Sequence, residues 1–277
     1  MRPDAETNNA FLYCLAVAAK RTEVSVVFFV AMSNHYHAGI IDNRGRLPEF
    51  FEHFHKLFAK HQNALRGRWE NFWATEQTSA VELVDAEDVL AKMVYALSNP
   101  VKDRLVHEAH QWPGASSLRA QLYGHSLSAR RPGRLFRPDG QMPEAIALEL
   151  ARAPGFETTP HDDFVALLRE RLAAVEASLR AEHLGAGVEV VGRKAVLQQR
   201  WSDRPHTEES RRQLSPRVAC KNTWRRIETL RRNGSFVDAY RAARDLLLSG
   251  IDAVFPEGTY WLRRFAGAVC VLTVATG

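Results

Sequence analysis

The stretch VSVVFFVAMSNHYHAGII, residues 24–41, decides the fold of this chain. Residues 24–32 are apolar and rich in β-branched and aromatic side chains, which predicts a short buried strand. A second strand follows and is expected to end at about residue 42. Alternate side chains of a strand share one face, so His35 and His37 point to the same side. This spacing can offer two imidazoles to one metal ion.

The stretch MVYALSNPV, residues 93–101, belongs to a predicted helix. The helix is expected to begin at Asp85, an N-cap residue, and to end near Asn99, because a residue before proline is biased away from helical angles. At about 100° per residue, Tyr95 and Asn99 lie one turn apart and opposite the apolar stripe, with Lys92 nearby. A divalent metal beside a tyrosine nucleophile is a workable arrangement for breaking a phosphodiester. The stripe consists of Val89, Leu90, Met93, Val94 and Leu97.

Each of these two signals has a plain alternative when it is taken alone. The histidine pair then lies on a partly exposed strand without a metal, and the tyrosine lies on a solvated helix face. His53, His55 and His61 are interpreted as surface or boundary residues rather than ligands. The other predicted elements are helices over residues 6–20 and 47–65, a turn over 43–46 and a strand near 80–84. Helices and strands in this order suit an α+β, ferredoxin-like sandwich with an antiparallel sheet.

The composition favours a nucleic-acid partner. The chain has 277 residues, 45% of them hydrophobic, with a net charge of +5 and a pI of about 9.3. A basic balance of this kind fits nucleic acid better than an acidic small molecule. The three cysteines are far apart and form no C-x-x-C pair, so a reducing cytoplasm is expected rather than a disulfide scaffold or a zinc finger. The apolar runs are too short to span a bilayer, and no membrane partner is expected.

The character of the chain changes after residue 117. Residues 119–140 hold five arginines among Gly, Pro and Ser, which indicates a basic linker, and residues 142–184 have an alanine- and leucine-rich helical pattern. Residues 193–244 carry 14 Lys and Arg against five Asp and Glu, a local charge of +9, with Trp and Tyr interleaved. Such a cluster suits phosphate contacts and stacking on unpaired bases, and a solvated basic face is the alternative. The candidate DNA contacts in it are Arg225, Arg226, Arg231 and Arg232.

Several of these motifs resemble those of a known family. MSNHYH, residues 32–37, resembles the HUH motif, in which a bulky apolar residue separates two histidines. YALSNPVKDRLV and WPGASS, residues 95–106 and 112–117, resemble the segment with the catalytic tyrosine in single-tyrosine HUH transposases. The chain is most similar to the branch of REP-associated tyrosine transposases, including members with a long C-terminal extension. The resemblance covers about residues 4–118 and is vaguer in GRKAVLQQ and FPEGTYWLRRFA.

The resemblance implies a fold, a site and a reaction. It makes His35 and His37 metal ligands, Asn99 a third ligand or polar positioner, and Tyr95 the nucleophile. The implied partner is single-stranded or hairpin DNA, which is cut and rejoined through a 5′-phosphotyrosine with Mg²⁺ or Mn²⁺. Lys92, Lys102 and Arg104 are then expected to face the DNA. The implied organisation is a ferredoxin-like HUH domain over residues 1–118, a basic linker over 119–140 and a mainly helical, basic C-terminal region over 141–277.

One feature departs from the family pattern. Its members usually begin with a strand ahead of the segment that PDAETNNAFLYCLA, residues 3–16, resembles, and here Met1 stands only a few positions before it. We therefore expect that first strand to be missing and the histidine sheet to have an exposed edge. A catalytically impaired, hairpin-binding relic is the alternative function. An unrelated metal-dependent phosphoesterase with an incidental Tyr95 is a third, and a homodimer is left open.

Overall fold

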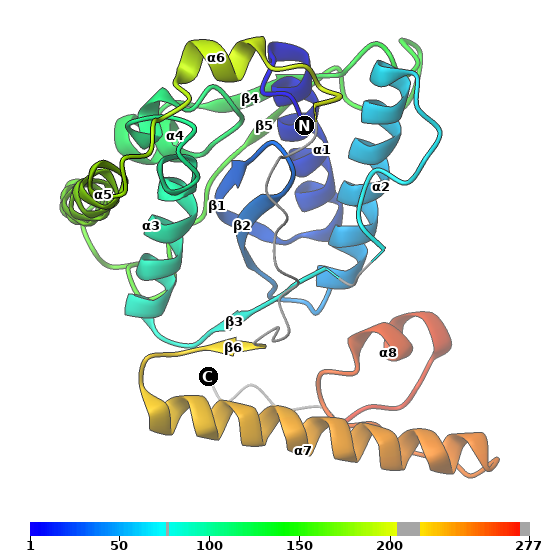
Figure 1. Cartoon of the computed structure of the whole chain (residues 1–277). Coiled ribbons are helices and arrows are strands. Elements are labelled where there is room, and N and C mark those ends of the chain that lie inside the picture. Colours follow the sequence, from blue (N-terminus) through cyan, green and yellow to red (C-terminus); the bar gives the residue numbers. More distant parts are fainter. Residues whose placement is uncertain (76–77, 204–216, 272–277) are drawn as a thin grey trace.

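Two antiparallel strands, β1 and β2, lie at the centre of the part of the chain that carries the histidines (Figure 1). In the computed structural model, which describes residues 1–75, 78–203 and 217–271, Ala31 pairs with Tyr36 and Val30 with His37. Both strands agree with the sequence prediction, except that β2 begins at Tyr36 and His35 therefore lies just before it. The elements in chain order are α1 (Ala5–Thr22), β1 (Ser25–Ala31), β2 (Tyr36–Ile41), α2 (Leu47–Arg66), β3 (Glu82–Leu83), α3 (Ala86–Lys102), the 3-10 helix η1 (Ala109–Gln111), α4 (Leu118–Tyr123), β4 (Leu127–Arg130), β5 (Ala145–Leu148), α5 (His161–Gly185), α6 (Arg193–Gln198), β6 (Val218–Ala219), α7 (Thr223–Leu248) and α8 (Tyr260–Ala266).

Helices cover both faces of β1. Phe29 and Ala31 belong to a core that α1, α2, β4 and β5 complete, whereas Phe28 and Val30 face a second core built on α3 and α5. In Figure 1, α2 and α3 accordingly lie on opposite sides of the two strands. Over its described residues the chain is therefore a mixed α+β protein with small antiparallel sheets, β1–β2 and β4–β5, and a short parallel pair, β3–β6.

Strand β2 is the edge of the central pair in the part of the chain that the structure describes. The far edge of β1 is covered, because the Ala31 amide donates to the carbonyl of Ala115 and the Ala151 amide donates to the carbonyl of Val26, both at 2.8 Å. The unpaired edge therefore runs along β2, whose residues are all half-buried. This strand carries His37.

The predicted helix over residues 47–65 is confirmed as α2, and its aromatic stripe packs against α1. Phe50, Phe54 and Phe58 are fully buried at four-residue spacing, and the ring of Phe11 meets Phe54 and Phe58 edge to face at 5.2 and 5.4 Å. The interpretation of His61 as a surface or boundary residue is wrong, since His61 is fully buried. It lies three residues after Phe58 and so continues the same buried stripe.

His53 and His55 are half-buried, as predicted, and His55 gives the fold a dependence on pH. The Tyr36 hydroxyl lies 2.6 Å from its Nε2 atom. Burial lowers the pKa of His55 from its ordinary 6.5 to about 4. The unfolded chain therefore binds this proton more readily than the folded chain does. The contribution of neutral His55 to the free energy of unfolding is complete above about pH 6.5 and is lost as the pH falls toward 4.

As the pH falls from 6.5 to 4, we expect the titration of His55 to lower the free energy of unfolding by on the order of 2 kcal/mol, allowing for the partial exposure of the ring. Urea unfolding of the wild type and of His55→Phe at the two pH limits measures the effect, and the variant should lose this part of the decline. His110→Gln, at an exposed histidine, serves as the control and should keep the wild-type profile. An identical decline in wild type and His55→Phe would contradict the expectation.

Helix α3 continues past its predicted end near Asn99 and reaches Lys102, so that prediction is wrong. Pro100 lies inside the helix, and the Asp103 amide donates to the Asn99 carbonyl at 2.9 Å. The reason is packing, because Val101 is 1% exposed and belongs to the core shared with α5. Burial of this last turn outweighs the local bias against helical angles before proline. The added turn brings the ammonium group of Lys102 over the ring of Tyr95.

Residues 119–140, which the composition suggests as a linker, contain regular structure. They include most of α4 and all of β4, and Ala129 of β4 packs in the core with α1. The predicted helix over 142–184 is wrong in its first part, because β5 pairs with β4 and α5 begins only at His161. Residues of β5 alternate between exposed and buried, a period of two that suits a strand. The domain boundaries themselves stay a prediction.

The C-terminal part is mainly helical and meets the rest of the chain beside α3. Strand β6 pairs in parallel with β3, and the long helix α7, gold to orange in Figure 1, runs past this pair. Glu82 of β3 forms an ion pair with Arg232 and accepts from Asn233 at 2.9 Å. No helix in the described part of the chain is both long and apolar enough to cross a membrane.

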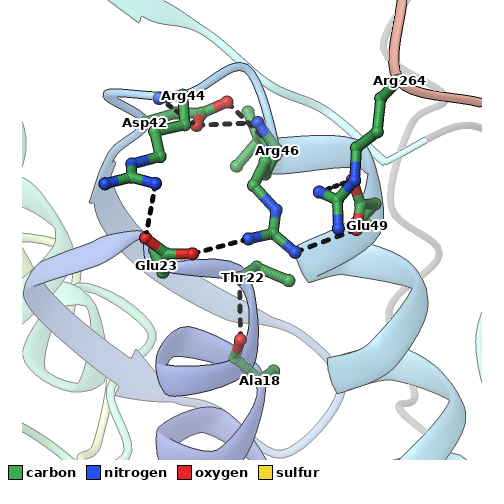
Figure 2. A network of polar contacts seen from close by, with 9 residues as sticks. Ala18, Thr22, Glu23, Asp42, Arg44, Arg46, Glu49 and Arg264 are labelled. Carbon is green, nitrogen blue, oxygen red and sulfur yellow. Dashed lines mark hydrogen bonds and ion pairs between the residues drawn. The ribbon is translucent and has the colours of Figure 1, made fainter. Parts of the chain in front are cut away.

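Helix α8 contacts the turn between β2 and α2 through a chain of ion pairs (Figure 2). Glu23 binds Arg44 and Arg46 at 2.8 and 2.9 Å. Arg46 also reaches Glu49 at 3.4 Å, and Arg264 of α8 contacts the same glutamate at 3.0 Å. The network joins the end of α1, the start of α2 and α8. It therefore stabilises the turn between β2 and α2, residues 42–46.

Candidate functional site

The two histidines of the HUH-like stretch come together as the strand spacing predicts. His37 lies in β2 and His35 just before it, and their ring centroids are 4.9 Å apart. The short turn is closed by the Met32 amide, which donates to the His35 carbonyl at 2.8 Å. Nδ1 of His35 lies 2.7 Å from the Asn34 side-chain oxygen. A proton on Nδ1 leaves a lone pair on Nε2, the form in which an imidazole binds a metal.

Asn99 completes a three-residue arrangement with the histidines. Its amide Nδ2 lies 2.5 Å from Nε2 of His37 and 3.4 Å from Nε2 of His35. The residue is 3% exposed, so the core holds its side chain in this position. Turning the amide over would place its oxygen toward the same point, and an amide oxygen can ligate a metal whereas an amide nitrogen donates hydrogen bonds. Two imidazole nitrogens and one amide oxygen can therefore surround a divalent ion.

Tyr95 lies beside this group, one helical turn before Asn99. Its ring meets that of His37 edge to face with centroids 5.8 Å apart. The Lys102 ammonium donates to the Tyr95 hydroxyl at 3.1 Å and lies 4.7 Å from the ring centroid, and the Lys92 ammonium lies 5.3 Å from that centroid. Ammonium groups in these positions stabilise negative charge that develops on the phenol oxygen.

His35, His37, Tyr95 and Asn99 all line one open cleft of about 660 Å³. Strand β2 forms one wall, α3 forms another, and the segment 78–83 closes a third side. The two lysines near Tyr95 also line it. The volume falls in the range of ligand-binding pockets, about 300–1,000 Å³. The cleft can therefore admit a ligand to the histidines and the phenol together.

The remaining predicted DNA contacts differ in their surroundings. Arg104 is exposed in the turn after α3, outside the lining of the cleft. Arg225 and Arg232 form ion pairs with Asp85 and Glu82, so they attach α7 to the region where α3 begins.

Arg226 and Arg231 are exposed on α7, and no ion pair is found for them among the described residues. These two are the better candidates for phosphate contacts. Residues 204–216 of the basic stretch lie outside the described residues.

A second group that could hold a metal was not predicted from the sequence. Asp85, Asp88 and Cys220 place one ligand atom each within 4.8 Å of one another. The Cys220 thiol donates to Asp85 at 3.1 Å across 135 positions of the chain. The D-x-x-D spacing at the start of a helix is visible in the sequence, but it also suits an ordinary helix start. No local signal links these carboxylates to a distant cysteine.

Comparisons of the chain with protein-family models, with curated proteins and with solved structures find no match.

Proposed function

We propose that this chain is a metal-dependent, single-strand DNA endonuclease and transposase of the single-tyrosine HUH type. The observation that carries the proposal is the meeting of His35, His37, Asn99 and Tyr95 in one open cleft. The two histidines come from β2 and the residue before it, and Asn99 and the nucleophile come from α3, as the resemblance to REP-associated tyrosine transposases implies. The matching fold proposal is a ferredoxin-like HUH domain, with β2 as its histidine strand and α3 as its tyrosine helix.

The donor set fits a divalent cation. His35 and His37 would hold it through Nε2, and Asn99 through its amide oxygen. Imidazole and oxygen donors together suit Mn²⁺, and Mg²⁺ accepts such sites when water and phosphate oxygens complete the shell. When bound, such an ion polarises the scissile phosphate and offsets charge on its oxygens.

The protein's own groups account for the remaining chemistry. The Tyr95 oxygen attacks phosphorus, a bond forms between them, and the bond from phosphorus to the 3′-oxygen breaks. The phenol loses one proton and the leaving 3′-oxygen takes up one, so the exchange is balanced without a high-energy cofactor. Lys102, 3.1 Å from the phenol oxygen, stabilises its charge while the proton moves. The 3′-hydroxyl can later attack the phosphotyrosine and rejoin the strand.

The second candidate function is a hairpin-binding relic that no longer cuts. It is favoured by the unpaired edge of β2 in the described part of the chain. An edge strand holds its side chains less firmly than a strand paired on both sides, and catalytic ligands need firm placement.

Covalent capture of DNA tests the proposal. A set of end-labelled single-stranded hairpins is incubated with the full chain and Mn²⁺, then resolved under denaturing conditions. We expect a labelled protein–DNA adduct that a chelator abolishes. Cleavage without an adduct would favour a hydrolytic phosphoesterase. Binding without cleavage or adduct would favour the relic.

A further inference from the structure

We propose that Asp85, Asp88 and Cys220 form a second metal site, which takes Zn²⁺ and fastens the start of α7 to the start of α3. The site is separate from the histidine cleft and does not depend on the proposed DNA chemistry.

The placement of the three side chains points to a cation. Asp88 and Cys220 are 6% and 7% exposed, and the three ligand atoms lie within 4.8 Å of one another. One oxygen of Asp88 accepts from the Lys221 amide at 3.0 Å. Its other oxygen, Oδ2, is buried and has no hydrogen-bond partner among the described residues. A buried carboxylate oxygen without a partner is costly, and a bound cation removes that cost.

The side chain of Asp85 provides a second observation that points to a bound cation. It occupies the N-cap position of α3, where an aspartate ordinarily accepts from the first backbone amides of the helix. Its side chain makes no such capping bond and instead accepts from the Cys220 thiol at 3.1 Å. One carboxylate oxygen is therefore directed to the cysteine and the other to Arg225, and neither caps its own helix.

The charges balance when a divalent ion is present. Two carboxylates and a thiolate together carry three negative charges, and Arg225, which pairs with Asp85, supplies one positive charge. A divalent cation supplies the other two.

The donor set selects the metal. A thiolate favours Zn²⁺ or Co²⁺ over Mg²⁺ or Ca²⁺, and carboxylate oxygens are accepted zinc ligands. Three protein ligands leave a fourth tetrahedral position for water, which can enter beside the half-buried Asp85. The bound ion would join Cys220, which follows β6, to the helix that carries Tyr95 and Asn99.

Cobalt titration of the metal-free full chain tests the site. We expect one equivalent of Co²⁺ to give a thiolate-to-cobalt charge-transfer band, which Zn²⁺ then displaces. Cys220→Ser should abolish the band, and Asp88→Asn should weaken Zn²⁺ binding at least tenfold. Cys270→Ser is the matched control and should keep the band. His37→Ala should also keep it, which separates this site from the histidine cleft.

Protection from alkylation provides a test that needs no variant. Zn²⁺ should slow modification of Cys220 by iodoacetamide, read by mass spectrometry, and leave Cys270 unaffected. A band that survives Cys220→Ser would overturn the proposal. So would a wild-type chain in which Co²⁺ gives no thiolate band, or in which Zn²⁺ leaves Cys220 unprotected.

Discussion

Replacing Tyr95 with phenylalanine should abolish the covalent protein–DNA adduct and leave DNA binding close to that of the wild type, because the cationic groups that contact phosphates are kept. The substitution removes one oxygen, the proposed nucleophile. The ring that meets His37 edge to face remains, so the walls of the cleft keep their shape. Lys102 loses its hydrogen bond to the hydroxyl but stays exposed to solvent.

The measurement combines denaturing gels for the adduct with fluorescence anisotropy for binding. Tyr123→Phe is the matched control, since that tyrosine is 58% exposed on α4 and lies outside the lining of the cleft. It should form the adduct at the wild-type rate. An adduct that persists in Tyr95→Phe would assign the nucleophile to another residue.

Replacing His37 with alanine should remove metal-dependent cleavage and cost at least about 100-fold in Mn²⁺ affinity, since loss of an outer-shell partner alone typically costs 10–100-fold. Nε2 of His37 is the nitrogen nearest to the Asn99 amide, at 2.5 Å, so it lies at the centre of the donor set. Its removal leaves one imidazole and one amide, too few protein ligands for a firm site. Asn99→Ala should weaken Mn²⁺ binding less, because an amide oxygen is the weaker donor.

Titration of cleavage against Mn²⁺, with direct binding followed by electron paramagnetic resonance, measures both quantities. His53→Ala provides the matched control, at a half-buried histidine of α2 outside the cleft. It should keep the wild-type metal dependence. If His37→Ala cleaves with unchanged Mn²⁺ affinity, the ion is held elsewhere. The group of Asp85, Asp88 and Cys220 is then the next candidate site.

Much of the cleft follows from local periodicity. The H-x-H spacing at the start of β2 predicts that His35 and His37 lie on one side, and a spacing of four on α3 places Asn99 one turn after Tyr95. Such relations hold within a single element, so the sequence contains them. The buried apolar stripe of α3 was predictable for the same reason.

The end of α3 was not predictable in this way. The local rule before Pro100 stops the helix near Asn99, but burial of Val101 continues it to Lys102. The position of a lysine 3.1 Å from the Tyr95 hydroxyl depends on that added turn. Likewise, no local spacing in the sequence predicts the ion pair between Arg225 and Asp85, which joins segments 140 positions apart.

The sequence by itself determined that the two histidines stand two positions apart at the start of β2 and which residue types share a face of α3. Only the tertiary structure decided which faces meet. It brought Asn99 to the histidines and brought Cys220 to Asp85 across 135 positions. The physical reason is the distance along the chain over which each kind of interaction acts. Backbone geometry fixes relations within a few residues, whereas contacts between distant segments depend on how the two cores on either side of β1 pack.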